Sequence, residues 1–259
     1  MTMTDAVAGP VRADIVRTTN VAHVAVAVVI AVVVTLIGWP LGLGVWAIAL
    51  GVIVGAGVAA LAFLRGDQMA LSALGAEPLE PGRYPQLDNI VEGLVVSNGF
   101  RMPAMYVVDE AAPNAFVVGR TARHGALAVT TGLIESLRRI ELEGVLAHEL
   151  SRIRSGETRA AVTAATLVCR PLGFAGGLAE SLAARLVDPA VGVRADLAGV
   201  SLTRYPPGLA AALAKLDADG RTVARNPRAY RHLWIDPPED AIVGAQFSIS
   251  DRVEVLTEL

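Results

Sequence analysis

The residues best suited to chemistry lie in one short run, His148-Glu149-Leu150-Ser151-Arg152. In the helical pattern His-Glu-x-x-His, residues four apart share a face, so two imidazoles can hold one metal ion while the glutamate polarises its water. Here Arg152 stands four residues after His148. A guanidinium stays protonated and has no lone pair to offer a metal. The run therefore predicts the helix of a metal-dependent hydrolase in which one ligand position is filled by a cation.

Other segments of the chain extend this pattern well beyond five residues. They are PNAFVVGR at 113–120, AVTTGLI at 128–134, Ala195-Asp196, and LTRYPPGL at 202–209. In this order and spacing the chain resembles the HtpX-type membrane zinc metallopeptidases, relatives of the CAAX prenyl endopeptidases. The resemblance extends from about residue 73 to residue 256. It implies a zincin-like domain, α+β and mostly helical, with a small sheet over the motif helix.

The resemblance also implies a role for each matching position. In that family zinc is held by both histidines of His-Glu-x-x-His and by the glutamate of a later Glu-x-x-Ala-Asp motif. His148 matches the first ligand, Arg152 the second, and Gly192 the third. Glu149 matches the general base, and Asp196 matches the aspartate that supports the ligands. Two of the three ligand positions thus carry residues that cannot bind zinc.

Two further segments of the family have counterparts here. Asn114, Ala115 and Phe116 fall in the segment that resembles the substrate-binding edge strand. Such a strand pairs with extended peptides through its main chain, which requires no metal; alternatively, Asn114 is a turn residue after Pro113. The family tends to close with Thr-His-Pro-Pro before a final helix. Residues 247–253 stand in that place without the His-Pro-Pro.

Arg152 allows two interpretations. It follows Glu149 by three residues on one helical face, so a buried ion pair with Glu149 or Asp196 could stand where zinc would be. The alternative is a partly solvated surface pair of ~0.5 kcal/mol or less. A guanidinium about 4 Å from a divalent ion would repel it by roughly 8 kcal/mol at an effective dielectric of 20. His148 is then a former ligand, hydrogen-bonded in the core, or a weak metal ligand helped by water.

The composition indicates a membrane protein. Of the 259 residues 53% are hydrophobic and 18% charged, and the mean hydropathy is +0.51. No charged residue occurs between Arg17 and Arg65. That interval holds two apolar runs, 21–37 and 41–64, and each approaches the ~20 residues that a spanning helix needs. A signal peptide is disfavoured because the apolar run resumes directly after the turn.

Charge placement predicts the orientation. Arg12, Arg17 and Arg65 flank the apolar runs, whereas the turn between them has no Lys or Arg. The positive-inside bias then places both flanks in the cytoplasm, in a multi-pass protein of the inner (plasma) membrane. The single cysteine, Cys169, fits a reducing compartment and a buried apolar role. We expect a cytoplasmic tail at 1–18, two transmembrane helices at 19–64, and a peptidase-like domain at 65–259.

Apolar periodicity locates the elements around the motif. It predicts helices at 86–98, 141–154 and 209–216, and strands at 105–108, 116–118 and 126–130. Residues 75–85 are rich in Gly and Pro and read as a linker. Residues 160–187 are predicted to form a helical hairpin that is buried or lies on the membrane; whether they span it is left open by the sequence.

Three functions fit these residues. The leading hypothesis is a catalytically inactive pseudoprotease without a cofactor. It would bind a peptide segment or a membrane protein partner, or serve as a subunit of a homo- or hetero-oligomeric membrane assembly. The alternative is an active zinc endopeptidase that acts on membrane proteins. A third is a structural subunit whose groove beside 116–118 is filled. A net charge of −3 without a basic stripe argues against nucleic acid as a partner.

Overall fold

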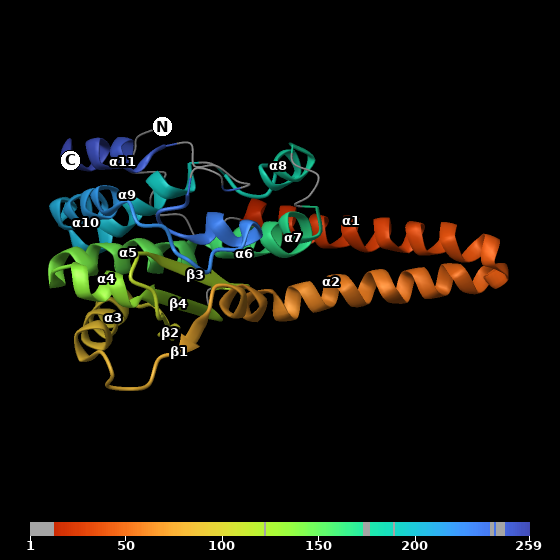
Figure 1. The fold of residues 1–259 in the computed structure, drawn as a ribbon, viewed down its shortest axis with the longest axis horizontal. Coiled ribbons are helices and arrows are strands. Elements are labelled where there is room, and N and C mark those ends of the chain that lie inside the picture. The colour runs from red at the N-terminus through yellow and green to blue at the C-terminus, as the bar shows by residue number, and fades with distance from the viewer. Residues whose placement is uncertain (1–12, 122, 173–176, 189, 239–240, 242–246) are drawn as a thin grey trace.

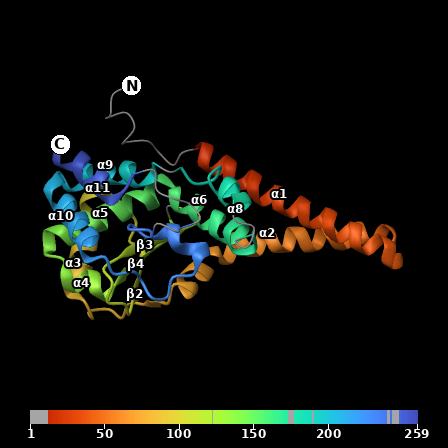
Figure 2. The same ribbon diagram turned by 45° about the horizontal axis from the view of Figure 1, so that its top comes forward.

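A computed structural model describes residues 13–121, 123–172, 177–188, 190–238, 241 and 247–259. A long helical hairpin projects from a domain in which helices surround a small sheet (Figure 1). A second view shows the same separation of hairpin and domain (Figure 2). The expected α+β, mostly helical fold with two N-terminal apolar helices is confirmed.

The helices follow one another along the chain as α1 (Ala13–Gly38), α2 (Val45–Ala73), α3 (Pro85–Asn98), α4 (Thr131–Ser136), α5 (Arg139–Ser155), α6 (Glu157–Thr163), α7 (Arg170–Leu172), α8 (Gly177–Ala183), α9 (Val191–Thr203), α10 (Pro206–Asp219) and α11 (Ile249–Thr257). Shorter helical turns are η2 (Trp39–Leu43), η3 (Ala164–Cys169) and η5 (Arg228–Leu233). The expected helices around 86–98, 141–154 and 209–216 correspond to α3, α5 and α10.

Helices α1 and α2 form the hairpin, and both are long and apolar enough to cross a membrane. They approach closely because glycines face the partner backbone. A Cβ on Gly55 would lie 2.2 Å from the Ala27 carbonyl oxygen, and one on Gly51 would lie 2.4 Å from that of Ala31. Small residues four apart allow this packing where lipid removes the hydrophobic drive between helices.

The hairpin helices are longer than the apolar runs. Helix α1 begins at Ala13, so residues 13–18 of the expected tail are helical, and α2 continues nine residues past Leu64. That extension is fastened to the domain. The Arg120 guanidinium donates to the Leu64 carbonyl at 3.1 Å, and Arg225 donates to that of Ser72 at 2.7 Å. The second helix is therefore both anchor and part of the domain.

The sheet has the order β1-β2-β4-β3. Its strands are β1 (Ala76–Pro78), β2 (Ala104–Val108), β3 (Ala115–Gly119) and β4 (Gly125–Thr130). Strand β2 runs parallel to β4, whereas β1 and β3 are antiparallel to their neighbours. The three predicted strands are present. Strand β1 lies within residues 75–85, for which the sequence predicts a linker. It was not predicted because its three residues, which include Glu and Pro, show no apolar alternation.

Helices cover both faces of the sheet. Alternate side chains of a strand point to opposite faces. In β3, Ala115 and Val117 pack with α3, α5 and α10, whereas Phe116 and Val118 pack with the end of α2, α6 and η3. All four are fully buried, which explains why β3 reads as an unbroken apolar run.

Residues 160–169 are buried on this second side of the sheet. Within the described ranges, α1 and α2 are the candidate spans, so the chain between 160 and 187 adds none where it is described. Cys169 is 1% exposed, as its predicted apolar role requires.

Candidate functional site

Helix α5 carries the motif and is buried along most of its length. It lies between the sheet and helices α9 and α10. Gly199 of α9 permits the closest contact, since a Cβ there would lie 2.7 Å from the His148 backbone nitrogen. This contact brings the first turns of α9, with Gly192 and Asp196, against the motif residues of α5.

Arg152 forms a buried ion pair with Glu149. Its Nη1 donates to the two carboxylate oxygens at 3.0 and 3.3 Å. The same nitrogen donates to the Leu233 carbonyl oxygen at 3.1 Å. Glu149 is 0% exposed and Arg152 is 4% exposed. The pairing of Arg152 with a carboxylate is thus present, with Glu149 as the partner.

Asp196 has other partners. Its Oδ1 accepts from His148 Nδ1 at 2.7 Å, and Arg252 donates to both carboxylate oxygens at 2.7 and 2.8 Å. Burial raises the pKa of Asp196, but the charge and hydrogen bonds of Arg252, followed by those of His148, lower it to about 2. An ionised carboxylate only accepts, so His148 Nδ1 is the donor of this hydrogen bond.

Sequence reasoning missed Arg252. It lies on α11, 56 residues after Asp196, in the segment that matches the family's closing motif. Its side chain is buried. The one available signal was a lone arginine on the buried face of an amphipathic helix, flanked by Ile249 and Leu256.

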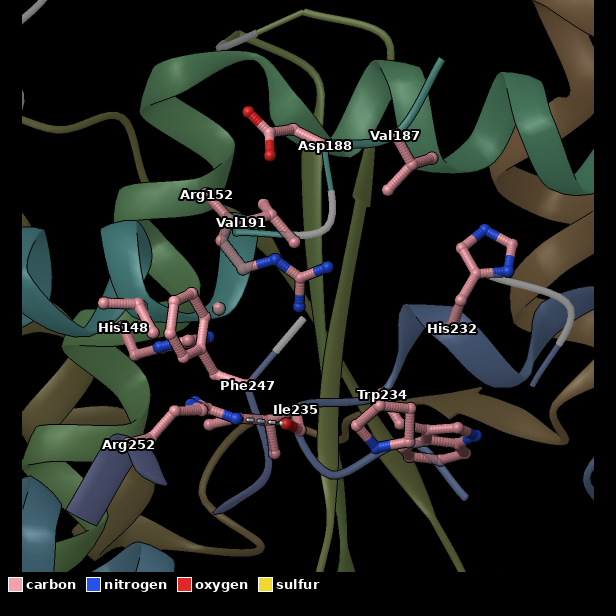
Figure 3. A pocket seen from close by; sticks show the side chains of 13 residues that line it. His148, Arg152, Val187, Asp188, Val191, His232, Trp234, Ile235, Phe247 and Arg252 are labelled. Carbon is pink, nitrogen blue, oxygen red and sulfur yellow. Dashed lines mark hydrogen bonds between the residues drawn. The ribbon is translucent and has the colours of Figure 1, made fainter. Parts of the chain in front are cut away.

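A small cavity of about 50 Å³ joins these groups. Figure 3 shows the Arg152 side chain reaching the centre of the view, with His232 to the right and Trp234 and Arg252 below. His148, Asp188 and Gly192 also line the cavity. A Cβ on Gly192 would lie 3.5 Å from Arg252 Nε. The cavity has room for a few waters.

His232 belongs to the same wall. Its Nε2 donates to the Ala161 carbonyl oxygen at 3.0 Å, and its buried Nδ1 has no hydrogen-bond partner among the described residues. Burial lowers the pKa of His232 to about 4; the hydrogen bond to the Ala161 carbonyl opposes this shift, and the charge of Arg152 adds to it. His232 is 8% exposed, so its ring is packed in the interior.

Comparisons with known proteins identify the family of this chain. The model of Peptidase family M48 matches residues 81–193. A protease HtpX homolog of Tropheryma whipplei (strain Twist) is 34% identical over 214 residues, covering 71% of this chain and 74% of that protein. The chain belongs to the HtpX-type peptidases.

Two further relatives differ in the identity and in the length of the match. The protease HtpX homolog of Acaryochloris marina is 43% identical over 121 residues, covering 45% of this chain and 41% of that protein. The homolog of Thermoanaerobacter pseudethanolicus is 28% identical over 239 residues, covering 77% and 80%. The family and the two apolar helices make this chain a membrane protein.

The residues at the HtpX-type metal position do not fit zinc. A zinc site takes three or four nitrogen, sulfur or oxygen donors from the protein. Within the described part of the chain, no cluster of three His, Cys, Asp or Glu side chains is placed to hold a metal. Of the three family positions, only His148 bears a donor, and the Arg152 guanidinium lies beside Glu149.

The edge strand β3 is already paired with another segment of the same chain. The Ile235 amide donates to the Ala115 carbonyl at 2.8 Å, and Trp234 bridges to Phe116. The Asn114 side chain donates to the Asp236 carbonyl at 2.9 Å and accepts from its amide at 3.3 Å.

Both site arginines hold this covering segment, residues 233–236. Arg152 donates to the Leu233 carbonyl, and Arg252 Nη1 donates to that of Ile235 at 2.8 Å. The segment therefore lies between β3 and the two ion pairs, over the strand that resembles the family's peptide-binding edge.

Proposed function

We propose that this protein is a membrane-anchored pseudoprotease of the HtpX type, which does not hydrolyse peptides and acts as a membrane-protein partner or as a subunit of a membrane assembly. The observation that carries the proposal is the buried Arg152–Glu149 pair. Glu149 matches the general base, and its oxygens accept from a cation instead of a water bound to zinc.

The chemistry of a general base supports this assignment. Such a group must lie within hydrogen-bond reach of the proton that it removes and must be free to accept it. Protonation of Glu149 would break its pair with Arg152 and leave the guanidinium buried beside a neutral acid, which is costly. Asp196, the other buried carboxylate of the motif region, does not replace it, because Asp196 is held by Arg252 and His148.

The covered edge strand favours a partner that binds elsewhere. A peptide that paired with Ala115 and Phe116 would have to displace residues 234–236 and their hydrogen bonds. The hairpin, by contrast, exposes apolar side chains along both helices. We therefore assign partner contact to the hairpin and not to the groove.

The test is the metal content and peptidase activity of the purified full-length protein. We expect zinc well below one ion per chain after dialysis, and no cleavage of casein that a chelator abolishes. An HtpX-type relative with both motif histidines, purified in the same way, serves as the positive control. One zinc per chain together with chelator-sensitive cleavage would overturn the proposal.

Restoring the donors gives a second, sharper test. Arg152→His with Gly192→Glu supplies the two missing ligands, with the Glu side chain beside Arg252. Arg252 would pair with that carboxylate, so we expect only weak zinc binding until Arg252→Leu is added. The triple variant should bind zinc more tightly than the double variant, read as affinity and as a zinc-dependent rise in unfolding temperature.

The single Arg152→His and Arg252→Leu variants are the matched controls. They report whether each change alone preserves folding. A folded triple variant that binds zinc no better than the parent would show that the pocket is not a donor-depleted zinc site.

A further inference from the structure

A second cavity lies outside the motif site, between the membrane hairpin and the helices that follow η3. Its volume is about 940 Å³, at the upper end of the ~300–1,000 Å³ usual for ligand pockets. It adjoins a cavity of about 900 Å³ near η5, and the two share Met69 and Arg170. This pair of cavities has no part in the chemistry described above.

The larger cavity is apolar along the hairpin. One wall consists of α1 side chains between Val21 and Ile30 and of α2 side chains between Val58 and Ala62. The opposite wall is formed by leucines and valines of the domain, which are Leu167, Val168, Leu172, Leu182 and Leu186. The hairpin wall lies in the charge-free stretch between Arg17 and Arg65, at the depth of lipid acyl chains.

The domain end of the same cavity is basic. Arg170 and Arg185 are its ionisable lining residues, and Arg170 also lines the adjoining cavity together with Arg65 and Arg228. No acidic side chain of a described residue lines either cavity. Among the described residues neither Arg170 nor Arg185 has an ion pair, and Arg170 donates only to the Met69 sulfur at 3.9 Å.

We propose that this cavity binds one anionic phospholipid. The acyl chains lie against α1 and α2, and the phosphate group is held at the arginine end by Arg170, with Arg185 adding positive charge. The change from apolar to basic lining runs along the hairpin, in the direction in which a phospholipid changes from tail to headgroup. Basic pockets beside transmembrane helices are a recurring way to bind anionic headgroups.

A helix of a partner protein explains the cavity less well. It would cover the apolar wall but would leave Arg170 and Arg185 beside an apolar surface without counter-charge, which is unfavourable at membrane depth. A phospholipid matches both ends. The proposal does not depend on the loss of catalysis, nor on which side of the membrane the domain occupies.

The test is lipid retention by the full chain, measured by native mass spectrometry in detergent with added phosphatidylglycerol or phosphatidylcholine. We expect one phosphatidylglycerol per chain, bound in preference to phosphatidylcholine. Arg170→Gln with Arg185→Gln should weaken phosphatidylglycerol binding by roughly thirtyfold, because each arginine near an anionic surface contributes about 1 kcal/mol. Arg101→Gln with Arg139→Gln removes the same charge from exposed sites and should change nothing.

The acyl part has its own variant. Ala25 lines the cavity, so Ala25→Trp should fill it and weaken retention, whereas Ala60→Trp places the ring on an exposed position outside it. Inorganic phosphate alone should not displace the lipid. Equal binding of both lipids, or unchanged binding by the folded double arginine variant, would overturn the proposal. A dimer or a bound peptide in place of the lipid would also overturn it.

Discussion

At the scale of single residues, two arginines neutralise the two carboxylates of the motif region. Arg152 pairs with Glu149, and Arg252 pairs with Asp196, with all four side chains buried. A buried charge is tolerated only when it is paired and hydrogen-bonded. Each arginine also donates to a backbone carbonyl of residues 233–236. Charge compensation and closure of the edge strand therefore depend on the same two side chains.

Removing one member of the buried pair should be strongly destabilising. Arg152→Ala leaves Glu149 buried without its cation and the Leu233 carbonyl without its donor, so we expect a loss of about 3–5 kcal/mol. The measurement is thermal or denaturant unfolding in detergent. Arg139→Ala, an exposed change on the same helix, should lie within about 0.5 kcal/mol of the parent.

A double-mutant cycle separates the pair from either side chain alone. Glu149→Gln with Arg152→Met removes both charges, so the double variant should lose less stability than the sum of the two single variants. Additive losses would mean that the two groups do not interact across the 3.0 Å contact.

His232 should make stability depend on pH between about 6.5 and 4. Its pKa falls from an ordinary 6.5 to about 4 in the folded protein because burial disfavours the charged ring. The unfolded chain then binds a proton that the folded chain refuses, so stability falls as pH falls through this window and levels off below it, by up to about 3 kcal/mol.

The readout is the unfolding temperature against pH for the parent, His232→Gln and His124→Gln. His232→Gln should flatten the profile between pH 6.5 and 4, whereas the exposed His124 should leave it unchanged. Asp196 acts in a lower window, since its stabilising charge is lost only as pH falls from about 3.8 to about 2. Identical slopes in the parent and His232→Gln would contradict this assignment.

At the scale of elements, the sequence predicted the helices and strands that have their own apolar periodicity. Strands β2, β3 and β4 and helices α3, α5 and α10 follow apolar periodicity that can be read within each segment. Strand β1 escaped prediction because its order comes from pairing with β2 and not from its own three residues. The nine residues of α2 beyond Leu64 are helical where polar contacts to Arg120 and Arg225 replace lipid.

The ion pairs and the covering of strand β3 were harder to predict, because they depend on contacts between segments that are distant in the sequence. The ligand positions could be matched one by one, including the partnership of Arg152 with a carboxylate. Neither the role of Arg252 nor the covering of Ala115 by Ile235 follows from local sequence, since 56 and 120 residues separate the partners. Such pairings are settled by tertiary packing.

The hairpin gives a prediction with an internal control. Gly55→Val would place a Cβ 2.2 Å from the Ala27 carbonyl oxygen, forcing α1 and α2 apart. We expect a loss of about 1–3 kcal/mol from overpacking, seen as a lower unfolding temperature. Gly57→Val meets nothing within 4 Å and should leave stability nearly unchanged. Equal effects of the two variants would contradict the close helix packing.

At the scale of the whole molecule, the orientation of the domain can be tested directly. Arginines flank the hairpin and are absent from its turn, which favours a cytoplasmic domain. In Glu80→Cys the thiol is exposed on the domain, and in Leu43→Cys it lies at the hairpin tip. An impermeant maleimide should label the tip in intact cells and the domain only after lysis. Labelling of residue 80 in intact cells would mean that the topology is the reverse of the predicted one. The native Cys169 is buried and should not be labelled.

The unbroken course of α2 has a mechanical consequence. Its 29 residues rise about 44 Å from the hairpin tip to the sheet, at about 1.5 Å per residue. No hinge separates the part in the bilayer from the part that contacts β1 and β3. If α2 tilts to match a thinner bilayer, the whole domain must therefore rotate with it. The angle between the domain and the membrane plane then depends on the thickness of the bilayer.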